Sequence, residues 1–534
     1  MEFDWIIVGA GSAGSVLANR LTADGRTTVA VIEAGKPDNS VLIKMPMGLM
    51  WLMGGKRWNY GFRSSPQEHL DKREVPVPRG KALGGSSSIN GMIYIRGHRT
   101  DFDAWATMGC PGWSYDDVLP YFRKSEVNGR LGGDGYHGDD GELHVSDNRD
   151  PHRLNERFFG AGDMLQIPRN PDFNGAHQEG LGMYQTTTHE GKRWSTADAF
   201  LRPAMNRPNL TVLTGRQVRR VIVEDKRAKG VETDQGKLTA RAGVILAAGA
   251  IASPQLLQLS GIGDPARLSQ LGIDLVYGNP AVGDNLHDHP NVMLMRKIKS
   301  SESYGLSLVG IPRAALAAFN YFYRNRGMFA SNVVEAGGFA RTIPGIPAPD
   351  VQFHFVPFHR STVPGRIYAW GHGYALHVCV LRPTSRGRVD AVSRDPAVAP
   401  RIDPNMMATE YDRETLLRGT RLARRIMESP TFAEVNGEEL LPGEQAQSDE
   451  DLMAFIRERC GTVYHPVGTC RMGSDAEAVV EPHRLTVNGL NGLHVVDASV
   501  MPQIVSGNTN AATIMIAEKV AEAIMAEARM SRAA

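Results

Sequence analysis

The pattern of hydrophobic and polar positions near the start of the chain predicts a strand, a helix and a second strand over residues 4–33. Residues 5–8 form a short apolar run, residues 13–21 repeat apolar side chains at helical spacing, and residues 29–32 form a second apolar run. Apolar runs without polar alternation are typical of strands buried in a parallel sheet. We therefore expect a β–α–β unit with a Gly-rich turn after its first strand.

A stretch rich in glycine, proline and serine follows over residues 45–90. It holds too many turn-forming residues for long regular elements, and too many Trp, Met and Leu residues for a disordered segment. We interpret it as an ordered excursion that packs over a ligand.

Later segments predict further sheet and helix. Four strand-like runs between residues 209 and 249 predict a β-meander that rejoins the parallel sheet. Between residues 312 and 459, long helical patterns mixed with strands predict a second, substrate-facing domain. The helices are expected at 411–429 and 449–460, and the strands at 351–356 and 374–378. A last strand at 493–496 and a helix from about 511 to 529 suggest that both ends of the chain share one sheet.

The apolar run from Leu308 to Tyr323 is interrupted by polar residues and proline, so it does not have the composition of a membrane span. We expect a buried amphipathic helix at this position instead.

The net charge indicates which kind of molecule the protein binds, and the cysteine spacing indicates whether it has disulfide bonds or a zinc site. The 59 lysines and arginines against 58 aspartates and glutamates leave a net charge of +1, which favours a small-molecule partner over nucleic acid. The cysteines lack the spacing of a disulfide framework or a zinc site; they are Cys110, Cys379, Cys460 and Cys470. From the cysteine spacing we expect no metal ion and a reducing compartment. The first apolar run leads straight into glycines and does not form a signal peptide, so we expect a cytoplasmic location.

Residues 9–14 read Gly-Ala-Gly-Ser-Ala-Gly, the GxGxxG pattern of dinucleotide sites, at the turn between the first strand and the helix. Gly9 permits the tight turn, Gly11 lets the backbone approach a pyrophosphate, and Gly14 allows close helix packing. Glu33 ends the second strand, where its carboxylate can bind ribose hydroxyl groups; the alternative is an ordinary surface residue at a strand end. NAD and FAD share this pattern, so the motif alone does not choose between them.

Longer motifs carry a resemblance to a known family. Residues 79–90 read RGKALGGSSSIN, residues 249–263 read GAIASPQLLQLSGIG, residues 464–473 read YHPVGTCRMG, and residues 496–510 contain VDASVMP and GNTN. In this order they resemble the signatures of the glucose–methanol–choline (GMC) flavoprotein oxidoreductases, over residues 4–528. The resemblance implies an α/β fold, α+β overall, in which a Rossmann-like FAD-binding domain is interwoven with a substrate domain built on an antiparallel sheet and helices.

The resemblance also implies a domain division and a cofactor. We expect a discontinuous FAD-binding domain of residues 1–155, 207–305 and 466–534, and a substrate-binding domain of residues 156–206 and 306–465. Some choline oxidases attach the flavin through a histidine at the place of Ile89, and isoleucine cannot form that bond, so non-covalent FAD is expected. The residues expected to contact FAD are Gly9, Gly11, Ser12, Ala13, Gly14, Glu33, Ala34, Arg79, Gly84, Gly85, Ser86, Asn90, Gly91, Val218, Asp497, Ala498, Asn508 and Thr509.

By the same resemblance, His465 and Asn508 form the catalytic pair. His465 would take the hydroxyl proton of an alcohol, Asn508 would bind the same oxygen, and hydride would pass to flavin N5. Asn508 could instead cap the last helix, as could Asn510, because asparagine is a favoured N-cap residue.

The relatives that the chain resembles most are bacterial FAD-dependent alcohol and choline dehydrogenases, so we expect a primary alcohol to be oxidised to its aldehyde. Electrons would pass to a quinone, an artificial dye or another acceptor. The expected substrate contacts are Glu335 and Phe355, although a carboxylate such as Glu335 is more often hydrogen-bonded within the fold. The apolar region from Leu306 to Phe339 suggests a channel for an uncharged alcohol. Peripheral contact with the inner face of a membrane would accompany a quinone acceptor, but no anchor is visible.

Several alternatives stay open at this point. Within the family they are an oxygen-using alcohol oxidase and a choline dehydrogenase; on the same fold they are an FAD-containing lyase, a photoenzyme and a redox sensor. The pairing of His465 with Asn508 favours oxidation over the lyase and the photoenzyme, whereas the redox sensor stays open until alcohols are shown to bleach the flavin. A metal-dependent alcohol dehydrogenase is disfavoured, because His465 and Cys470 alone cannot fill a tetrahedral site.

Overall fold

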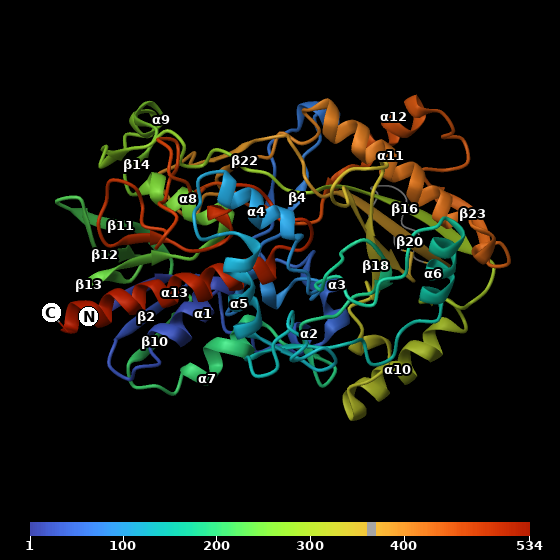
Figure 1. Cartoon of the computed structure of the whole chain (residues 1–534), viewed down its shortest axis with the longest axis horizontal. Coiled ribbons are helices and arrows are strands. Elements are labelled where there is room, and N and C mark those ends of the chain that lie inside the picture. The colour runs from blue at the N-terminus through green and yellow to red at the C-terminus, as the bar shows by residue number, and fades with distance from the viewer. Residues whose placement is uncertain (360–369, 534) are drawn as a thin grey trace.

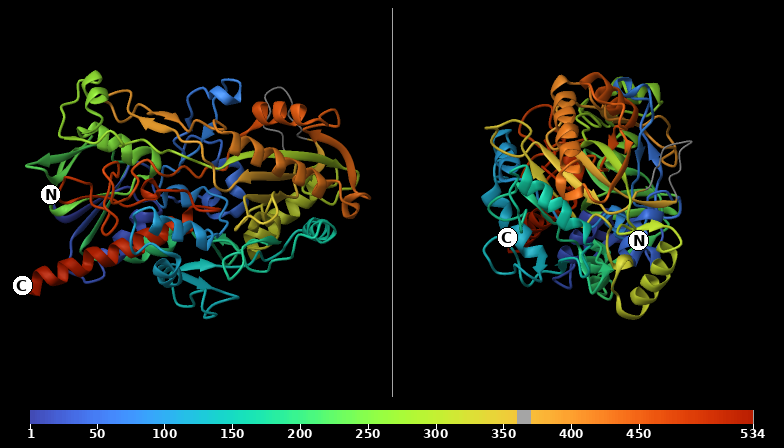
Figure 2. Two further views of the ribbon diagram at one scale, coloured as in Figure 1. Left: turned by 45° about the horizontal axis from the view of Figure 1, so that its top comes forward. Right: turned by 90° about the vertical axis from the view of Figure 1, so that its right-hand side faces the viewer.

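The computed structural model describes residues 1–359 and 370–533 and is built around two β-sheets. Figure 1 shows the sheets toward opposite ends of the long axis of the molecule, and Figure 2 shows the last helix, α13 (Asn510–Ala533), running along one side. Among the described residues, no helix combines the length and the apolar character that a membrane crossing requires.

The first sheet has the strand order β10-β2-β1-β13-β12-β11, with β25 beside β13. The β–α–β prediction is confirmed, because α1 (Ser12–Leu21) connects two parallel strands. Strands β11 to β13 form the expected antiparallel meander, and β25 pairs with β13, so both ends of the chain share this sheet. The strands are β1 (Glu2–Val8), β2 (Val29–Glu33), β10 (Leu210–Thr214), β11 (Val218–Glu224), β12 (Arg227–Thr233), β13 (Gly236–Leu246) and β25 (Leu493–Val495).

The second sheet is antiparallel, with the order β23-β16-β20-β19-β18-β7 and with β17 and β24 at its margins. Helix α11 (Glu410–Met427) packs on this sheet and α12 (Asp449–Arg459) packs on α11, close to the predicted bounds of both helices. The strands are β7 (Gly180–Met183), β16 (Pro290–Ile298), β17 (Gly305–Leu306), β18 (Ala336–Ala340), β19 (Val351–Val356), β20 (Gly371–Val380), β23 (Asn436–Leu441) and β24 (Gly461–Thr462). Strand β16 thus belongs to this sheet although the sequence placed residues 207–305 with the FAD-binding part.

The segment over residues 45–90 is ordered and contains short elements only, as its composition predicted. These are η1 (Pro46–Gly48), α3 (Leu49–Leu52), β3 (Phe62–Arg63), η2 (Glu68–Leu70), β4 (Pro76–Val77) and η3 (Gly85–Ser88), and α2 (Val41–Lys44) directly precedes the segment. Its side chains form one wall of the cavity described below.

The remaining elements complete the two layers around the sheets. The helices are α4 (Arg99–Thr107), α5 (Tyr115–Ser125), α6 (Leu154–Met164), α7 (Arg202–Ala204), α8 (Gly249–Leu259) and α9 (Pro265–Gln270). Two-stranded sheets are formed by β5 (Glu126–Asn128) with β6 (Leu143–Val145), β8 (Thr188–His189) with β9 (Lys192–Arg193), β14 (Ile262–Gly263) with β15 (Tyr277–Gly278), and β21 (Arg388–Asp390) with β22 (Arg401–Asp403).

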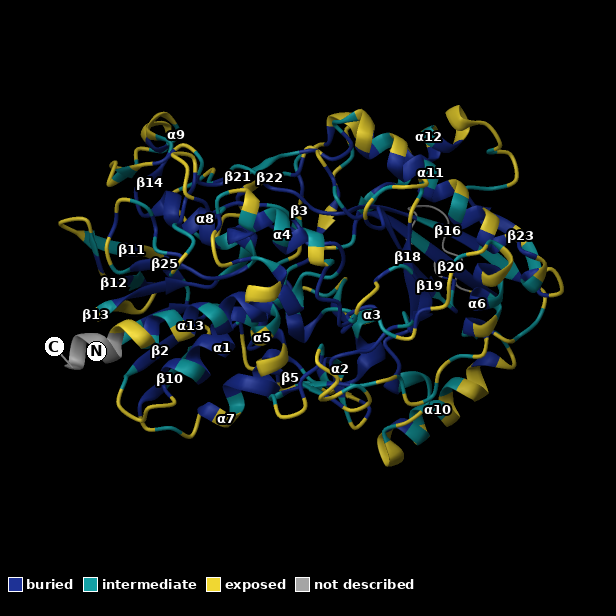
Figure 3. Ribbon diagram, viewed as in Figure 1, coloured by how far each residue is buried: buried dark blue, intermediate teal, exposed yellow. Residues whose placement is uncertain are grey.

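Helix α10 (Gly310–Arg324) departs from the sequence expectation. Within this fully described helix, Gly310 and Tyr321 are the buried residues, and the expectation of a buried amphipathic helix is wrong. Figure 3 shows exposed positions along most of its length. The expected channel is wrong for the same reason, because between Leu306 and Phe339 the cavity is contacted at Val334 and not by α10.

Candidate active site

A cavity of about 380 Å³ extends from the carboxyl ends of β1 and β2 to the second sheet. Its lining includes Val8 and Glu33 at one end, and Asn291, His354 and His377 from β16, β19 and β20 at the other. Ligands of open parallel sheets bind outside the carboxyl ends of the strands, so the first end is the place for a dinucleotide.

The GxGxxG turn forms the first end of the cavity. Gly11, Ser12 and Ala13 line it, at the N-terminus of α1, where no side chain caps the helix. The first N–H groups of a helix carry partial positive charge and suit a pyrophosphate. Glu33 accepts hydrogen bonds from the N–H groups of Ala10 (3.0 Å) and Gly35 (2.7 Å), and burial raises the pKa of its carboxyl group.

Glycines of this region serve two different purposes. A Cβ atom at Gly11 would have no neighbour closer than 3.9 Å, and at Gly91 or Gly249 it would meet nothing within 4 Å, so empty space adjoins these lining positions. A Cβ at Gly14 would instead lie 1.9 Å from the carbonyl oxygen of Gly9. Gly11 therefore leaves room for a ligand, whereas Gly14 leaves room for the protein's own backbone, as the motif predicts.

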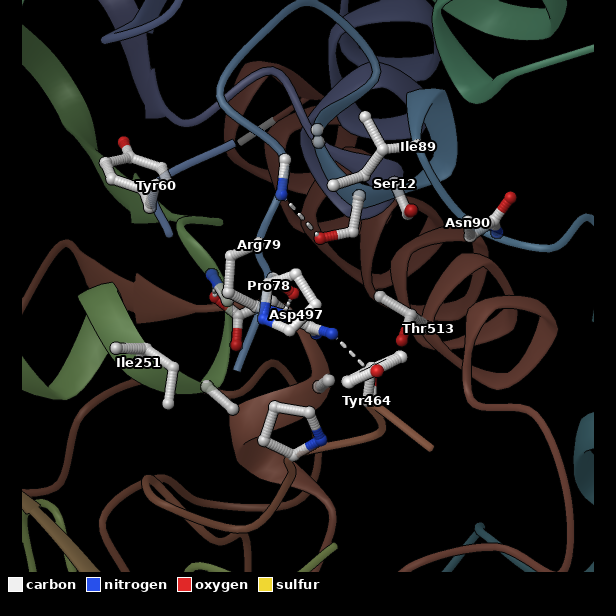
Figure 4. Close-up of a pocket in the computed structure, with 18 of the residues that line it drawn as sticks. Ser12, Tyr60, Pro78, Arg79, Ile89, Asn90, Ile251, Tyr464, Asp497 and Thr513 are labelled. Atoms are coloured by element: carbon white, nitrogen blue, oxygen red, sulfur yellow. Dashed lines mark hydrogen bonds between the residues drawn. The ribbon is translucent and has the colours of Figure 1, made fainter. Parts of the chain in front are cut away.

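Two helix N-termini meet at the cavity and are joined by a hydrogen bond. Ser12 Oγ of α1 donates to Asn510 Oδ1, the first residue of α13, over 2.6 Å. The N-terminus of a third helix, α8, also lies here. The Asp497 carboxylate accepts hydrogen bonds from its Gly249 N–H (2.8 Å) and Ser253 Oγ (2.6 Å). In Figure 4, Ser12, Asn90, Asp497 and Thr513 surround this part of the cavity. Because α13 begins at Asn510, Asn508 remains free to face the cavity.

Most of the residues expected at the cofactor line the cavity. They are Gly9, Gly11, Ser12, Ala13, Glu33, Ala34, Arg79, Gly85, Ser86, Asn90, Gly91, Val218, Asp497, Ala498, Asn508 and Thr509. Two do not: Gly14 packs against Gly9, and a Cβ at Gly84 would lie 2.3 Å from Ser88 Oγ. Ile89 lines the cavity where the relatives with covalent flavin carry histidine.

The expected substrate contacts lie outside the cavity lining. Glu335 is buried and accepts hydrogen bonds from His152 N (2.6 Å), Asn155 Nδ2 (2.9 Å) and Ser331 Oγ. Phe355 stacks on Phe158 in the core beneath the second sheet. The structure thus brings His465 and Asn508 together but places Glu335 and Phe355 elsewhere.

The catalytic pair is part of a chain of hydrogen bonds. Asn508 Nδ2 lies 3.2 Å from His465 Nε2, and Asn508 Oδ1 accepts from Gln352 Nε2 over 3.4 Å. On the other side of the ring, His465 Nδ1 lies 3.1 Å from His289 Nδ1. Since Gln352 sets the orientation of the Asn508 amide, the Asn508 N–H group donates to the His465 Nε2 lone pair, which places the ring proton of His465 on Nδ1.

The backbone around His465 is held by Asp288. This carboxylate accepts from the N–H groups of His465 and His289, each over 2.8 Å, so that the two histidines are fixed to the start of β16. Tyr464 has a positive φ of 70°, which turns the chain just before His465. The Arg79 side chain reaches the Tyr464 carbonyl oxygen, as Figure 4 shows.

Electrostatics keeps this end of the cavity neutral. Burial holds the pKa of His465 well below its usual value, and the neighbouring His289 and His354 lower it further. Burial also lowers the pKa of His289 and His377 to about 4 and that of His354 to about 3. At neutral pH the ring of His465 is therefore unprotonated and can accept a proton.

Sequence reasoning missed the residues around this pair. His354 and His377 are direct cross-strand partners on β19 and β20, and Asn291 Nδ2 lies 3.3 Å from His377 Nδ1. Each is a polar residue in a strand whose residues are mostly apolar, and this contrast was the available signal. The sequence does not show that β16, β19 and β20 pair with one another, and it is this pairing that brings the three residues together.

Comparison with known proteins decides the family. The GMC oxidoreductase family models match residues 3–291 and 383–517. The chain belongs to the GMC oxidoreductase family. Among GMC relatives, it is 46% identical over 99% of its length to an alcohol dehydrogenase [acceptor] of Pseudomonas putida, with 97% of that protein covered. It is 41% identical over its whole length to an oxygen-dependent choline dehydrogenase of Sinorhizobium fredii, again with 97% covered.

A solved GMC structure has the same fold. Pyridoxine 4-oxidase from Mesorbium loti is 32% identical, with a TM-score of 0.88 over 97% of this chain and 98% of the other. FAD is the cofactor of this family. The cavity fits it, because the space beside Gly11, Gly91 and Gly249 and the helix N-termini provide an extended cradle for an anionic dinucleotide.

Proposed function

We propose that this GMC oxidoreductase oxidises uncharged primary alcohols to aldehydes, with His465 as the base, non-covalent FAD as the cofactor, and a quinone or a similar carrier as the electron acceptor. The observation that carries the proposal is the contact between His465 Nε2 and Asn508 Nδ2, two residues that line the cavity. The likeness to the Pseudomonas putida alcohol dehydrogenase [acceptor] supports the reaction and the type of acceptor.

The proton steps rest on residues of this chain. An alcohol oxygen that enters between the pair accepts the Asn508 N–H that otherwise donates to His465 Nε2, and the alcohol donates its own proton to the Nε2 lone pair freed in this way. Removal of that proton makes the carbinol carbon a better hydride donor. When bound, FAD supplies the two-electron acceptor for that hydride. His289 Nδ1 accepts the hydrogen bond from His465 Nδ1–H and stabilises the imidazolium cation that forms.

The charge of the lining supports an uncharged substrate. Among the described lining residues, the carboxylates are Glu33 and Asp497, both at the dinucleotide end. The opposite end carries His354, His377 and Asn291, of which the two histidines have lowered pKa values. A quaternary ammonium group would find no carboxylate to offset its desolvation there.

The first test uses the bound flavin as its reporter. The purified holoenzyme is mixed anaerobically with 1-hexanol, benzyl alcohol or choline, and its visible spectrum is recorded before and after air is admitted. We expect the two uncharged alcohols to bleach the flavin band, and recovery in air to be slow. Preferential bleaching by choline would overturn the substrate class, and fast recovery would identify an oxidase. A spectrum unchanged by every alcohol would contradict alcohol oxidation and favour the lyase, photoenzyme or sensor.

The second test removes the base. His465→Ala should lower kcat for the best alcohol at least about a hundredfold, because general base catalysis contributes about 10²–10⁴ in rate. The flavin absorbance per protein should stay unchanged. His69→Ala, which alters an exposed histidine, is the matched control. Near-normal turnover of His465→Ala would remove His465 from the mechanism.

A further inference from the structure

Helix α10 carries its apolar stripe on the outside of the molecule. At 100° per residue, Pro312, Ala315, Phe319 and Phe322 fall on one side of the helix, with Ile311, Leu316 and Tyr323 flanking them. Exposed Leu308 and Val309 directly precede the helix. The exposed fractions of the side chains are 85% for Leu308, 63% for Leu316, 65% for Phe322 and 75% for Tyr323. The opposite side is the one that contacts the protein, through buried Gly310 and Tyr321. Amphipathic helices of globular proteins normally show the reverse arrangement.

The charged side chains on α10 itself are Arg313 and Arg324, and Arg326 just beyond the helix is paired with Asp150. Residues 303–334 contain three arginines (Arg313, Arg324 and Arg326) and no aspartate or glutamate. Arg313 and Arg324 are exposed and lie at one border of the stripe by their helical positions. An exposed apolar stripe with phenylalanine and tyrosine, bordered by arginine, is the composition of a helix that lies in a membrane interface.

We propose that the outer face of α10 docks on a lipid bilayer that contains anionic lipids. The apolar side chains would enter the boundary between headgroups and acyl chains, and Arg313 and Arg324 would bind the anionic headgroups. A second copy of the chain fits this face less well. In a symmetric dimer the same patch meets itself, so the arginines of both copies would approach without a carboxylate in residues 303–334 to pair with them.

The docking face adjoins a wall of the catalytic cavity. Tyr321 of α10 packs in one cluster with Met45 and Ala330, and partly buried Leu42 of α2 packs against the same cluster. Helix α3, which follows this segment, contributes Leu49 to the cavity lining, and Met53 next to its end is a lining residue as well. Figure 1 shows α10 at the lower edge of the molecule, with α2 and α3 farther inside. Docking through α10 would therefore hold this wall near the bilayer surface, where apolar alcohols and carriers concentrate.

Vesicle binding tests the proposal. The FAD-loaded full chain is sedimented with vesicles of phosphatidylcholine alone and of phosphatidylcholine with phosphatidylglycerol. We expect binding to the anionic vesicles that weakens with added salt, and little binding to phosphatidylcholine. Phe319→Ser/Phe322→Ser should lower the partition coefficient at least tenfold. Arg313→Gln/Arg324→Gln should lower it by a similar factor, since each basic residue near an anionic surface contributes about fivefold.

The controls separate docking from folding and from dimer formation. Leu275→Ser/Val392→Ser removes two similarly exposed apolar side chains from other elements and should bind vesicles like the wild type. Flavin content and turnover of a water-soluble alcohol should be unchanged in every variant. The proposal is overturned if the wild type binds neither kind of vesicle, or if the Phe319→Ser/Phe322→Ser variant binds as well as the wild type. It is equally overturned if light scattering shows a dimer that this variant converts to a monomer.

Discussion

At the residue scale, the tautomer of His465 is determined by its two neighbours. Asn508 donates toward Nε2 on one side, and His289 accepts from Nδ1 on the other. During proton transfer the ring becomes a cation, and the hydrogen bond to His289 becomes charge-assisted. His289 is therefore a positioning residue that acts through His465.

This role of His289 predicts a graded effect of substitution. His289→Leu should lower kcat roughly 10- to 100-fold with little change in KM, because a hydrogen bond to a charged group contributes about 1.5–3 kcal/mol. His289→Asn keeps an acceptor oxygen and should recover part of the loss. Steady-state kinetics of both variants, normalised to flavin content, provide the measurement. Equal losses in the two variants, or a change confined to KM, would argue against the hydrogen-bonding role.

At the element scale, the two glycines Gly11 and Gly14 at the turn from β1 to α1 have different roles, one in cofactor binding and the other in backbone packing. Gly11 and Gly14 lie in one helical turn, but a Cβ at Gly11 enters empty space whereas a Cβ at Gly14 meets the Gly9 carbonyl at 1.9 Å. The same substitution at the two positions therefore has different consequences for the apoprotein.

Gly11→Ala should leave the Tm of the apoprotein unchanged and weaken FAD binding at least tenfold, because the methyl group occupies space beside the cofactor. Gly14→Ala should lower the apoprotein Tm by several degrees, because backbone must shift. Thermal melts with and without FAD, together with flavin titration, measure both effects. A Gly11→Ala protein that binds FAD normally would contradict the assignment of this turn to the cofactor.

The local sequence pattern predicted which helices and strands form better than it predicted which faces of them contact the rest of the protein. The β–α–β unit, the meander of β11 to β13, and helices α11 and α12 followed from periodicity and turn residues alone. Helix α10 shows the limit of that reasoning: its spacing reveals two faces, but not which of them contacts the protein. We assumed that the apolar face is buried, and in α10 it is the face on the outside.

The candidate site shows the same division between local and long-range information. Motifs adjacent in sequence, such as the GxGxxG turn and the segment with His465, located most of the cavity lining. His289, His354 and His377 lie on strands whose neighbours are set by pairing across long sequence separations. Glu335 and Phe355 were selected for their chemistry, and the fold uses that chemistry internally.

At the scale of the whole molecule, the buried histidines make stability depend on pH. His289, His354 and His377 have folded-state pKa values of about 4, 3 and 4, well below the usual 6.5. The unfolded chain therefore binds protons from pH 6.5 downward while the folded chain does not. The stability that these groups contribute is present above pH 6.5 and is lost as the pH falls toward 4.

Between pH 7 and pH 5 each of these histidines should remove about 2 kcal/mol from the free energy of unfolding. Asp288, whose pKa burial raises to about 6, acts in the opposite direction and returns about 1 kcal/mol. From these four groups together we expect a net loss of about 5 kcal/mol, measured by denaturant unfolding at both pH values. The double variant His354→Gln/His377→Gln should show a shallower pH dependence and His69→Gln the wild-type one. A free energy of unfolding that is flat over this range would contradict the burial of neutral histidines.

The bond between Ser12 and Asn510 joins residues 498 positions apart, and Arg20 of α1 forms an ion pair with Glu518 of α13 over the same separation. Strand β13 likewise completes its pairing only with β25, near the end of the sequence. During synthesis, the first β–α–β unit leaves the ribosome long before α13 and the residues around Asn508 exist. The cofactor site is therefore completed only once α13 has been made, and the growing chain must keep its first β–α–β unit competent to bind FAD until α13 has docked.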